Sequence, residues 1–177
     1  IRRAAAAVEV EVCPDPTRNL DEWTRLYAGL AERHRLAGIR AFSRAAFERQ
    51  LALPGMVAVR AERAGAVVGM ALWLSDPPSA HYHLAAYSPE GYEVSASYAI
   101  FDLALRHLHE LGVRRVDLGG SADAGSGEGL DRFKRGWANE ERVAHLCGRV
   151  LDRQGYKRLA AGRTGDWFPA YRDQGAA

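Results

Sequence analysis

The feature that most constrains the fold is a pair of apolar segments separated by a short turn. Residues 56–62 and 66–74 are mostly apolar, and Arg63-Ala64-Gly65 lies between them. Two apolar runs around a short glycine-containing turn predict an antiparallel β-hairpin. A further strand is predicted over residues 81–87. Because side chains alternate along a strand, one face of it should carry His81, His83, Ala85 and Tyr87.

Helical periodicity is found on both sides of these strands. Apolar residues recur at helical spacing from residue 20 to about residue 36, and Asn19 before them is a suitable N-cap. Ser43 is expected to cap a second helix, which ends at Pro54. A third helix is predicted from about residue 95 to residue 111. These helices can cover the sheet.

Shorter elements complete the prediction. Alternating apolar and polar residues predict a strand over residues 8–12. Further short strands are expected at residues 113–118 and 142–151, and a short helix at 130–137. This order mixes hairpins with crossover helices. It predicts an α/β (α+β) fold with a mixed central sheet and helices on both faces. The length predicts one domain over residues 1–177, which we expect to be part of a longer chain because no methionine precedes Ile1.

Composition excludes several classes of protein. The 24 basic residues include only two lysines, Lys134 and Lys157, and they are balanced by 22 acidic residues. No block of like charge is present, so no DNA-binding footprint is expected. Cys13 and Cys147 are too far apart in sequence to suggest a disulfide scaffold or a zinc cluster, which favours a cytoplasmic protein. The apolar runs are too short to predict a membrane span.

Two segments could carry chemistry. Glycines recur from Gly119 and Gly120 to Gly129, between a predicted strand and a predicted helix, where backbone N–H groups can approach an anion. The segment lacks the Lys-Ser/Thr of a nucleotide-binding loop and the full dinucleotide fingerprint, so a surface loop and a substrate contact both stay open. His81 and His83 have metal-ligand spacing, but no third ligand is recognisable, and no metal is predicted.

Lys134 is the most informative charged residue. Phe133 and Trp137 are four residues apart and share one face of the predicted helix, so Lys134 should point away from the buried side, toward the glycine segment. This chain uses arginine almost everywhere a plain positive charge would serve. A compact ammonium group at this position can stabilise a developing oxyanion or bind a phosphate.

Three motifs in the same order carry a family resemblance: His81-Tyr82-His83-Leu84, Asp117-Leu118-Gly119-Gly120 and Gly129-Leu130-x-x-Phe133-Lys134-x-x-Trp137. This series resembles the FemAB-like branch of the GNAT-fold acyltransferases, a branch that includes bacterial peptidoglycan-bridge aminoacyltransferases. The resemblance covers residues 57–150 and is to the second of the two GNAT-like domains of those enzymes. It implies a GNAT-like sheet for this chain.

The resemblance also implies a function. FemAB-type enzymes transfer an aminoacyl group from aminoacyl-tRNA to an amine, so we expect an N-acyltransferase with an activated donor and no tightly bound cofactor. The residue matching Lys134 lies near the transfer centre or the tRNA end in that family. Expected partners are an amine-bearing small molecule or a cell-wall precursor, and the acceptor end of tRNA. Donor or substrate binding is predicted for Phe133, Trp137, Gly119, Gly120, Tyr92 and Glu93.

Two alternatives remain open at the level of sequence. Acetyl-CoA-dependent GNAT enzymes usually carry an Arg/Gln-x-x-Gly-x-Gly/Ala loop before the central helix, and residues 88–95 do not match it. An acetyl-CoA-dependent enzyme is nevertheless the nearest alternative, and a non-catalytic binding module of a longer enzyme is the second. The proton acceptor is predicted among His81, His83 and Glu93, and no spacing selects one of them.

Overall fold

The computed structural model describes residues 1–120, 128–143, 145, 147–163 and 168–172. The chain separates into two compact units, Ile1–Trp137 and Ala138–Ala177, which are described separately here. The predicted single domain over residues 1–177 stays a prediction. None of the helices in the described residues combines the length and the apolar character that crossing a bilayer requires.

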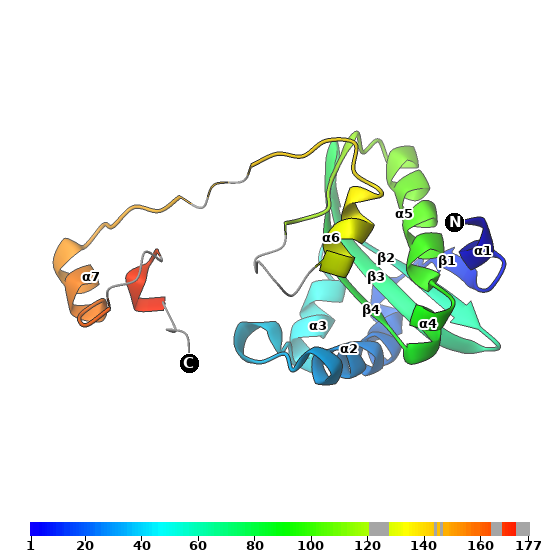
Figure 1. Ribbon diagram of the computed structural model, residues 1–177, viewed down its shortest axis with the longest axis horizontal. Helices are drawn as coiled ribbons and strands as arrows, with labels where there is room; N and C mark the ends of the chain where they lie inside the picture. The colour runs from blue at the N-terminus through cyan, green and yellow to red at the C-terminus, as the bar shows by residue number, and fades with distance from the viewer. Residues whose placement is uncertain (121–127, 144, 146, 164–167, 173–177) are drawn as a thin grey trace. The chain divides into compact units, whose positions relative to one another are not determined.

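The first unit is built on a five-stranded sheet (Figure 1). Its strands, β1 (Glu9–Val12), β2 (Met56–Arg63), β3 (Ala66–Asp76), β4 (Ser79–Tyr87) and β5 (Arg115–Asp117), lie side by side in sequence order. The pairs from β1 to β4 are antiparallel, whereas β5 is parallel to β4. The predicted mixed sheet is therefore confirmed. The crossover between β4 and β5 passes through the longest helix on that side of the sheet.

Helices cover both faces of this sheet (Figure 1). One face is covered by α2 (Leu20–His34) and α3 (Arg44–Leu51), and the other by α5 (Ala96–Glu110). Shorter helices precede, connect or follow these elements: α1 (Arg2–Ala5), η1 (Pro16–Asn19), η2 (Gly38–Arg40), α4 (Pro89–Glu93) and α6 (Glu128–Arg135). The second unit contains α7 (Arg153–Leu159) and η3 (Ala170–Arg172).

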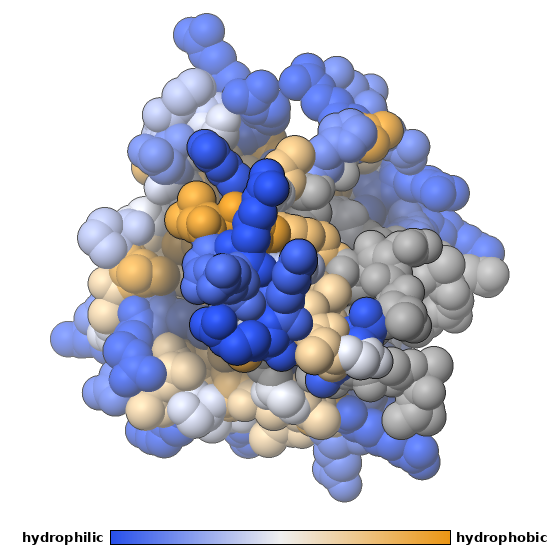
Figure 2. All heavy atoms as spheres, turned by 90° about the vertical axis from the view of Figure 1, so that its left-hand side faces the viewer, coloured by the Kyte–Doolittle hydropathy of each residue, from blue (hydrophilic) through white to orange (hydrophobic). Residues whose placement is uncertain are grey.

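The central strands are apolar on both faces because both faces are buried. Along β2, Val57 and Val59 pack in the cluster beneath α5, whereas Met56 and Ala58 pack in the cluster beneath α2 and α3. This explains why residues 56–74 form nearly continuous apolar runs rather than a strict alternation. Hydrophilic residues lie around most of the outline in Figure 2, and hydrophobic residues form small separate groups between them.

A β-bulge in β4 overturns one prediction about that strand. The register passes from Leu72 opposite Leu84 to Trp73 opposite Tyr82, which leaves His83 without a residue opposite it on β3. An extra residue reverses the alternation of side chains beyond it. As a result, Ala85 packs against the α5 cluster while His83 bonds to α3 on the other face. The predicted common face of His81, His83, Ala85 and Tyr87 is therefore wrong.

Two other predictions about local structure differ from what is observed. Asn19 occupies the predicted N-cap position of α2, but its side chain makes no capping hydrogen bond, and its amide donates to the carbonyl of Asp15 in the turn η1. Residues 142–151 contain no strand among their described members, and Val143 and Leu151 are 82% and 86% exposed. A strand needs a neighbour for its backbone N–H and C=O groups, which the sequence of the segment alone does not provide. The cap at Ser43 is confirmed, since its hydroxyl accepts from the N–H of Ala46.

Candidate active site

The candidate site lies where β4 and β5 separate. The two strands pair only from Ser79 opposite Arg115 to His81 opposite Asp117. Beyond this point β5 has ended, whereas β4 continues to Tyr87. The side chains of the last pair are close, with 3.6 Å between His81 Nδ1 and Asp117 Oδ2. The end of this short pairing therefore presents an imidazole and a carboxylate together.

The turn after β5 is held by the same carboxylate. Asp117 Oδ1 accepts a hydrogen bond of 2.7 Å from the backbone N–H of Gly119. Gly119 has a φ of +70°, a left-handed conformation that glycine adopts without the steric cost of a side chain. A Cβ atom at this position would lie 3.6 Å from Lys134 Nζ and 3.9 Å from His81 Cε1. The ammonium group of Lys134 and the ring of His81 therefore both lie within 4 Å of the position that a side chain on Gly119 would occupy.

Lys134 extends from α6 to this turn. Its Nζ donates a hydrogen bond of 3.0 Å to the carbonyl oxygen of Gly119. An ammonium group carries three N–H donors, so this bond leaves two for other acceptors. Partial burial lowers the pKa of Lys134, and the carboxylates of Asp131 and Asp117 act in the opposite direction. We call His81, Asp117, Gly119 and Lys134 the strand-end cluster.

His83 lies next to the strand-end cluster on β4 and differs from His81 in burial. Its Nε2 lies 3.1 Å from Oε1 of Gln50, which belongs to α3. Burial lowers the pKa of His83, and the nearby His81 lowers it further. Both effects favour the neutral imidazole, which can accept a proton. His81 is the more exposed of the two, with about half of its side chain accessible.

Phe133 and Trp137 hold α6 against α5. The ring of Phe133 lies edge-on to Phe101, with 4.7 Å between the centroids, and also contacts Tyr98 at 5.2 Å. Trp137 packs on the same Phe101 ring at 5.6 Å. These contacts direct Lys134, which lies between the two aromatic residues in sequence, toward the Gly119 turn. The predicted role of Phe133 and Trp137 in donor binding stays a prediction.

Tyr92 and Glu93 are not brought to the strand-end cluster. They belong to α4, which follows the far end of β4, whereas His81 lies near the start of that strand. Tyr92 packs against the ring of Tyr87 at 5.5 Å, and the Arg33 guanidinium lies 4.4 Å above its ring. Glu93 is exposed. Gly120 follows Gly119 directly and has open space around it, whereas residues 121–127 of the glycine segment lie outside the described residues.

Two residues of this region were missed by the sequence analysis as site residues. Asp117 had a local signal, because it precedes a glycine pair at the end of a predicted strand. Gln50 had none, since 33 residues separate it from His83. Within the described residues, no group of three His, Cys, Asp or Glu side chains is arranged to hold a metal ion.

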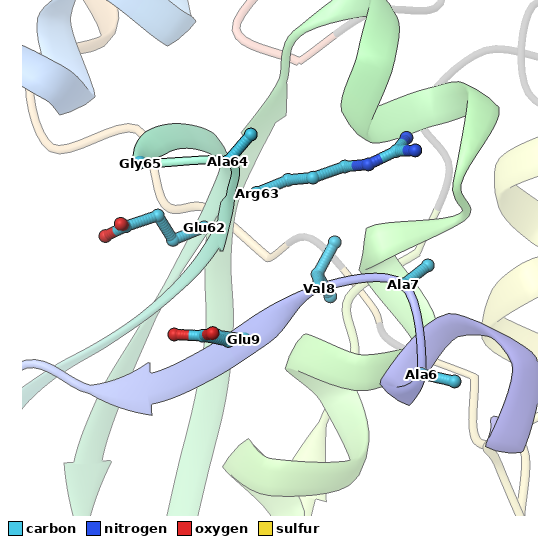
Figure 3. Close-up of a pocket in the computed structure, with 8 residues that line it drawn as sticks. All are labelled: Ala6, Ala7, Val8, Glu9, Glu62, Arg63, Ala64 and Gly65. Carbon is cyan, nitrogen blue, oxygen red and sulfur yellow. The ribbon is translucent and has the colours of Figure 1, made fainter.

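A cavity of the first unit lies away from the strand-end cluster. It has a volume of about 250 Å³ and is lined by residues 6–9 and 62–65, at the start of β1 and the turn between β2 and β3 (Figure 3). Glu9 and Glu62 point to one side of it and Arg63 to the other, where it pairs with Glu90 at 3.5 Å. The polar groups of this cavity therefore diverge, in contrast to those of the strand-end cluster.

Comparison with known proteins identifies the fold. Residues 1–135 match the family model of the acetyltransferase (GNAT) domain. The chain belongs to the GNAT acetyltransferase family. This result confirms the GNAT-like architecture and the class of acyltransferase, which the sequence motifs had implied. Among curated proteins, none matches the chain.

Solved structures of GNAT enzymes share this architecture. A ribosomal-protein-alanine N-acetyltransferase from Brucella melitensis biovar Abortus 2308 matches with a TM-score of 0.61 at 14% identity, over 81% of this chain and 100% of that one. The aminoglycoside acetyltransferase meta-AAC0020, from an uncultured soil metagenomic sample, matches with a TM-score of 0.61 at 14% identity, over 82% of this chain and 98% of that one. The aminoglycoside N-acetyltransferase AAC(6')-Iy, solved in complex with CoA, matches with a TM-score of 0.54 at 14% identity, over 80% of this chain and 100% of that one. At these identities the likeness shows the fold alone.

Proposed function

We propose that this GNAT domain is an N-acyltransferase that uses acyl-CoA, with acetyl-CoA as the simplest donor. The observation that carries the proposal is the position of Lys134, whose ammonium group lies beside Gly119 and His81 where β4 and β5 separate. Support for the donor comes from the acetyltransferase family to which residues 1–135 belong and from the CoA complex of AAC(6')-Iy. The aminoacyl-tRNA donor favoured by the sequence becomes the second candidate.

The proposed acyl transfer requires two groups from the protein, a proton acceptor and a cation near the developing oxyanion. The nitrogen of the acceptor amine attacks the thioester carbonyl, the new C–N bond forms, and the C–S bond breaks with its electron pair leaving on sulfur. The attacking nitrogen also loses a proton, for which His81 and His83 are the proposed acceptors. The intermediate carries a negative oxygen, and a cation placed to meet it stabilises the transition state by about 2–4 kcal/mol in a site that excludes water.

Lys134 fits the role of that cation. Its bond to the Gly119 carbonyl holds Nζ at this turn, and an ammonium group has two further N–H groups with which it can donate. The aromatic contacts of Phe133 restrict the helix that carries it. A group held in place before the reaction costs little reorganisation when charge develops. We propose Lys134 as the oxyanion-stabilising residue and an amine-bearing small molecule or cell-wall precursor as the acceptor.

One observation favours the aminoacyl-tRNA alternative. Residues 89–93, where acetyl-CoA-dependent enzymes usually carry a glycine-rich loop, form the helix α4. Ser88 caps this helix by accepting from the N–H of Gly91 at 3.1 Å. A Cβ atom on Gly91 would clash with the carbonyl oxygen of Val68, so this glycine serves the packing of α4 on β3. A donor held by contacts other than a glycine-rich phosphate loop is consistent with this arrangement.

A donor comparison tests the proposal. Purified protein is incubated with a panel of amines and either acetyl-CoA or charged tRNA, with and without ribonuclease, and the acylated product is measured. We expect product from acetyl-CoA, unaffected by ribonuclease. Product formed only from charged tRNA and lost after ribonuclease treatment would establish the second candidate. Absence of product from both donors would favour a binding module without catalytic activity.

A further inference from the structure

The bulge in β4 gives His83 a position that a regular strand would not. The residues on either side of it, Tyr82 and Leu84, both face partners on β3, whereas His83 has none. Bulges commonly re-aim one side chain at a sheet edge or beside a functional site. Here the side chain is turned toward α3. His83 lies two residues after His81, the last residue of β4 that pairs with β5.

Gln50 meets His83 from a firmly held helix. Phe47 and Leu51 of α3 are 1% and 2% exposed and form part of the core beneath the sheet. Gln50 lies three residues after Phe47 and one before Leu51, so it projects from the edge of the same buried face. The helix begins at a capped N-terminus, where Ser43 accepts from Ala46. The amide of Gln50 is therefore presented by an element with little freedom to move.

The contact with Gln50 favours one tautomer of His83. Oε1 of Gln50 is a carbonyl oxygen, which only accepts, so the 3.1 Å contact is a hydrogen bond when Nε2 of His83 carries the proton. A neutral imidazole has one N–H, and Nδ1 then holds the free lone pair. In the described part of the chain, Nδ1 has no hydrogen-bond partner. A basic nitrogen is thus left available beside the strand-end cluster.

We propose that Gln50 is a positioning residue that holds His83 in the Nε2–H tautomer, and that His83 accepts the proton of the acceptor amine through Nδ1. The inference rests on the proposed acyl transfer and selects between the two histidines. As the C–N bond forms, the proton moves from the amine nitrogen to Nδ1 and leaves a His83 imidazolium. The thioester supplies the leaving thiolate, so charge and protons balance.

The groups around His83 are suited to this role. Its titratable neighbour is His81 on the same strand, and the group facing it from α3 is the neutral amide of Gln50. α2 also packs against β4, but its Arg25 guanidinium donates to the carbonyl of Val67 and its Tyr27 hydroxyl to that of Arg40. Burial and the His81 charge keep the pKa of His83 low, so the imidazole is in its proton-accepting form at neutral pH.

Two measurements on the full chain test the inference. The ¹⁵N chemical shifts of the His83 ring report its tautomer and its titration, independently of any activity. The pH profile of kcat/KM for acetyl-CoA-dependent transfer reports the proton acceptor. The variants are Gln50→Glu, Gln50→Leu, His83→Gln and His81→Gln, with Gln154→Glu in α7 as the matched control for the added carboxylate.

We expect the Nε2–H tautomer in the wild type. Gln50→Glu should keep this tautomer and move both the His83 titration and the acid limb of the pH profile to higher pH by about one unit, because a carboxylate favours the imidazolium. Gln50→Leu should yield a mixture of tautomers and lower kcat about tenfold with little change in KM. His83→Gln should remove the acid limb, and Gln154→Glu should change none of these quantities.

The possible failures can be told apart. An Nδ1–H tautomer in the wild type, or an acid limb that persists in His83→Gln and disappears in His81→Gln, would overturn the inference while leaving acyl transfer intact. Unchanged profiles in both Gln50 variants would do the same. A wild-type protein that binds and transfers no acyl group would overturn the proposed function itself, and the role of His83 with it.

Discussion

Removal of the Lys134 ammonium is the sharpest perturbation of the proposed mechanism. Three variants separate its possible contributions: Lys134→Ala removes the cation, Lys134→Arg keeps the charge in another shape, and Lys157→Ala removes the chain's other lysine. Lys157 belongs to α7 and to the second unit, so its loss controls for a change in net charge.

The structure sets the expected magnitudes. Lys134 makes one charge-assisted bond of 3.0 Å from a partly exposed position, so its loss should cost about 1 kcal/mol of folding free energy. That corresponds to about 2–4 °C in Tm for a domain of this size. Loss of an oxyanion donor lowers kcat by about 10²–10³. Lys134→Arg should recover little, because a planar guanidinium cannot occupy the point now held by Nζ, 3.6 Å from the Cβ position of Gly119.

Steady-state kinetics and thermal melts on the same preparations provide the assay. We expect kcat to fall at least a hundredfold in Lys134→Ala with a small loss of Tm, and to stay at the wild-type value in Lys157→Ala. If Lys134→Ala keeps more than half of the wild-type kcat while remaining folded, the assignment of the oxyanion-stabilising group to Lys134 is wrong. A large loss of Tm would instead assign the lysine a structural role.

Three further predictions concern packing and titration. Phe133→Ala should lower the free energy of unfolding by about 2 kcal/mol, seen in denaturant melts, because a half-buried ring leaves the aromatic cluster on α5. Gly69→Ala should destabilise by about 1–3 kcal/mol, since its Cβ would lie 2.5 Å from a ring carbon of Tyr87, whereas Gly29→Ala, in α2 with nothing within 4 Å, should stabilise slightly in the same melts. Burial raises the pKa of the Cys13 thiol to about 11. Because the folded state holds this proton more tightly, its contribution of about 3 kcal/mol is complete below pH 9 and is lost as pH rises toward 11, which denaturant melts across that range would show. Constant stability from pH 9 to 11 would contradict the burial of this thiol.

The sequence predicted the site unevenly, and the reason is the range of the interactions. Lys134 and Gly119 were found because a local pattern marks each of them: an aromatic pair at helical spacing, and a glycine after a strand. Tyr92 and Glu93 were also predicted to bind the donor or substrate, yet they follow the opposite end of β4. No local sequence pattern distinguishes Gln50, because its proposed role depends on its contact with His83, which lies 33 residues away in sequence.

By itself, the sequence determined the elements that local periodicity encodes. The hairpin of β2 and β3, the helices α2, α3 and α5, and the mixed sheet between them follow from apolar spacing, turn residues and the order of elements, because burial selects those patterns directly. The tertiary structure decided the rest. A one-residue bulge set the face on which His83 lies, and residues 142–151 formed no strand among their described members, since pairing depends on neighbours that a periodic pattern does not specify.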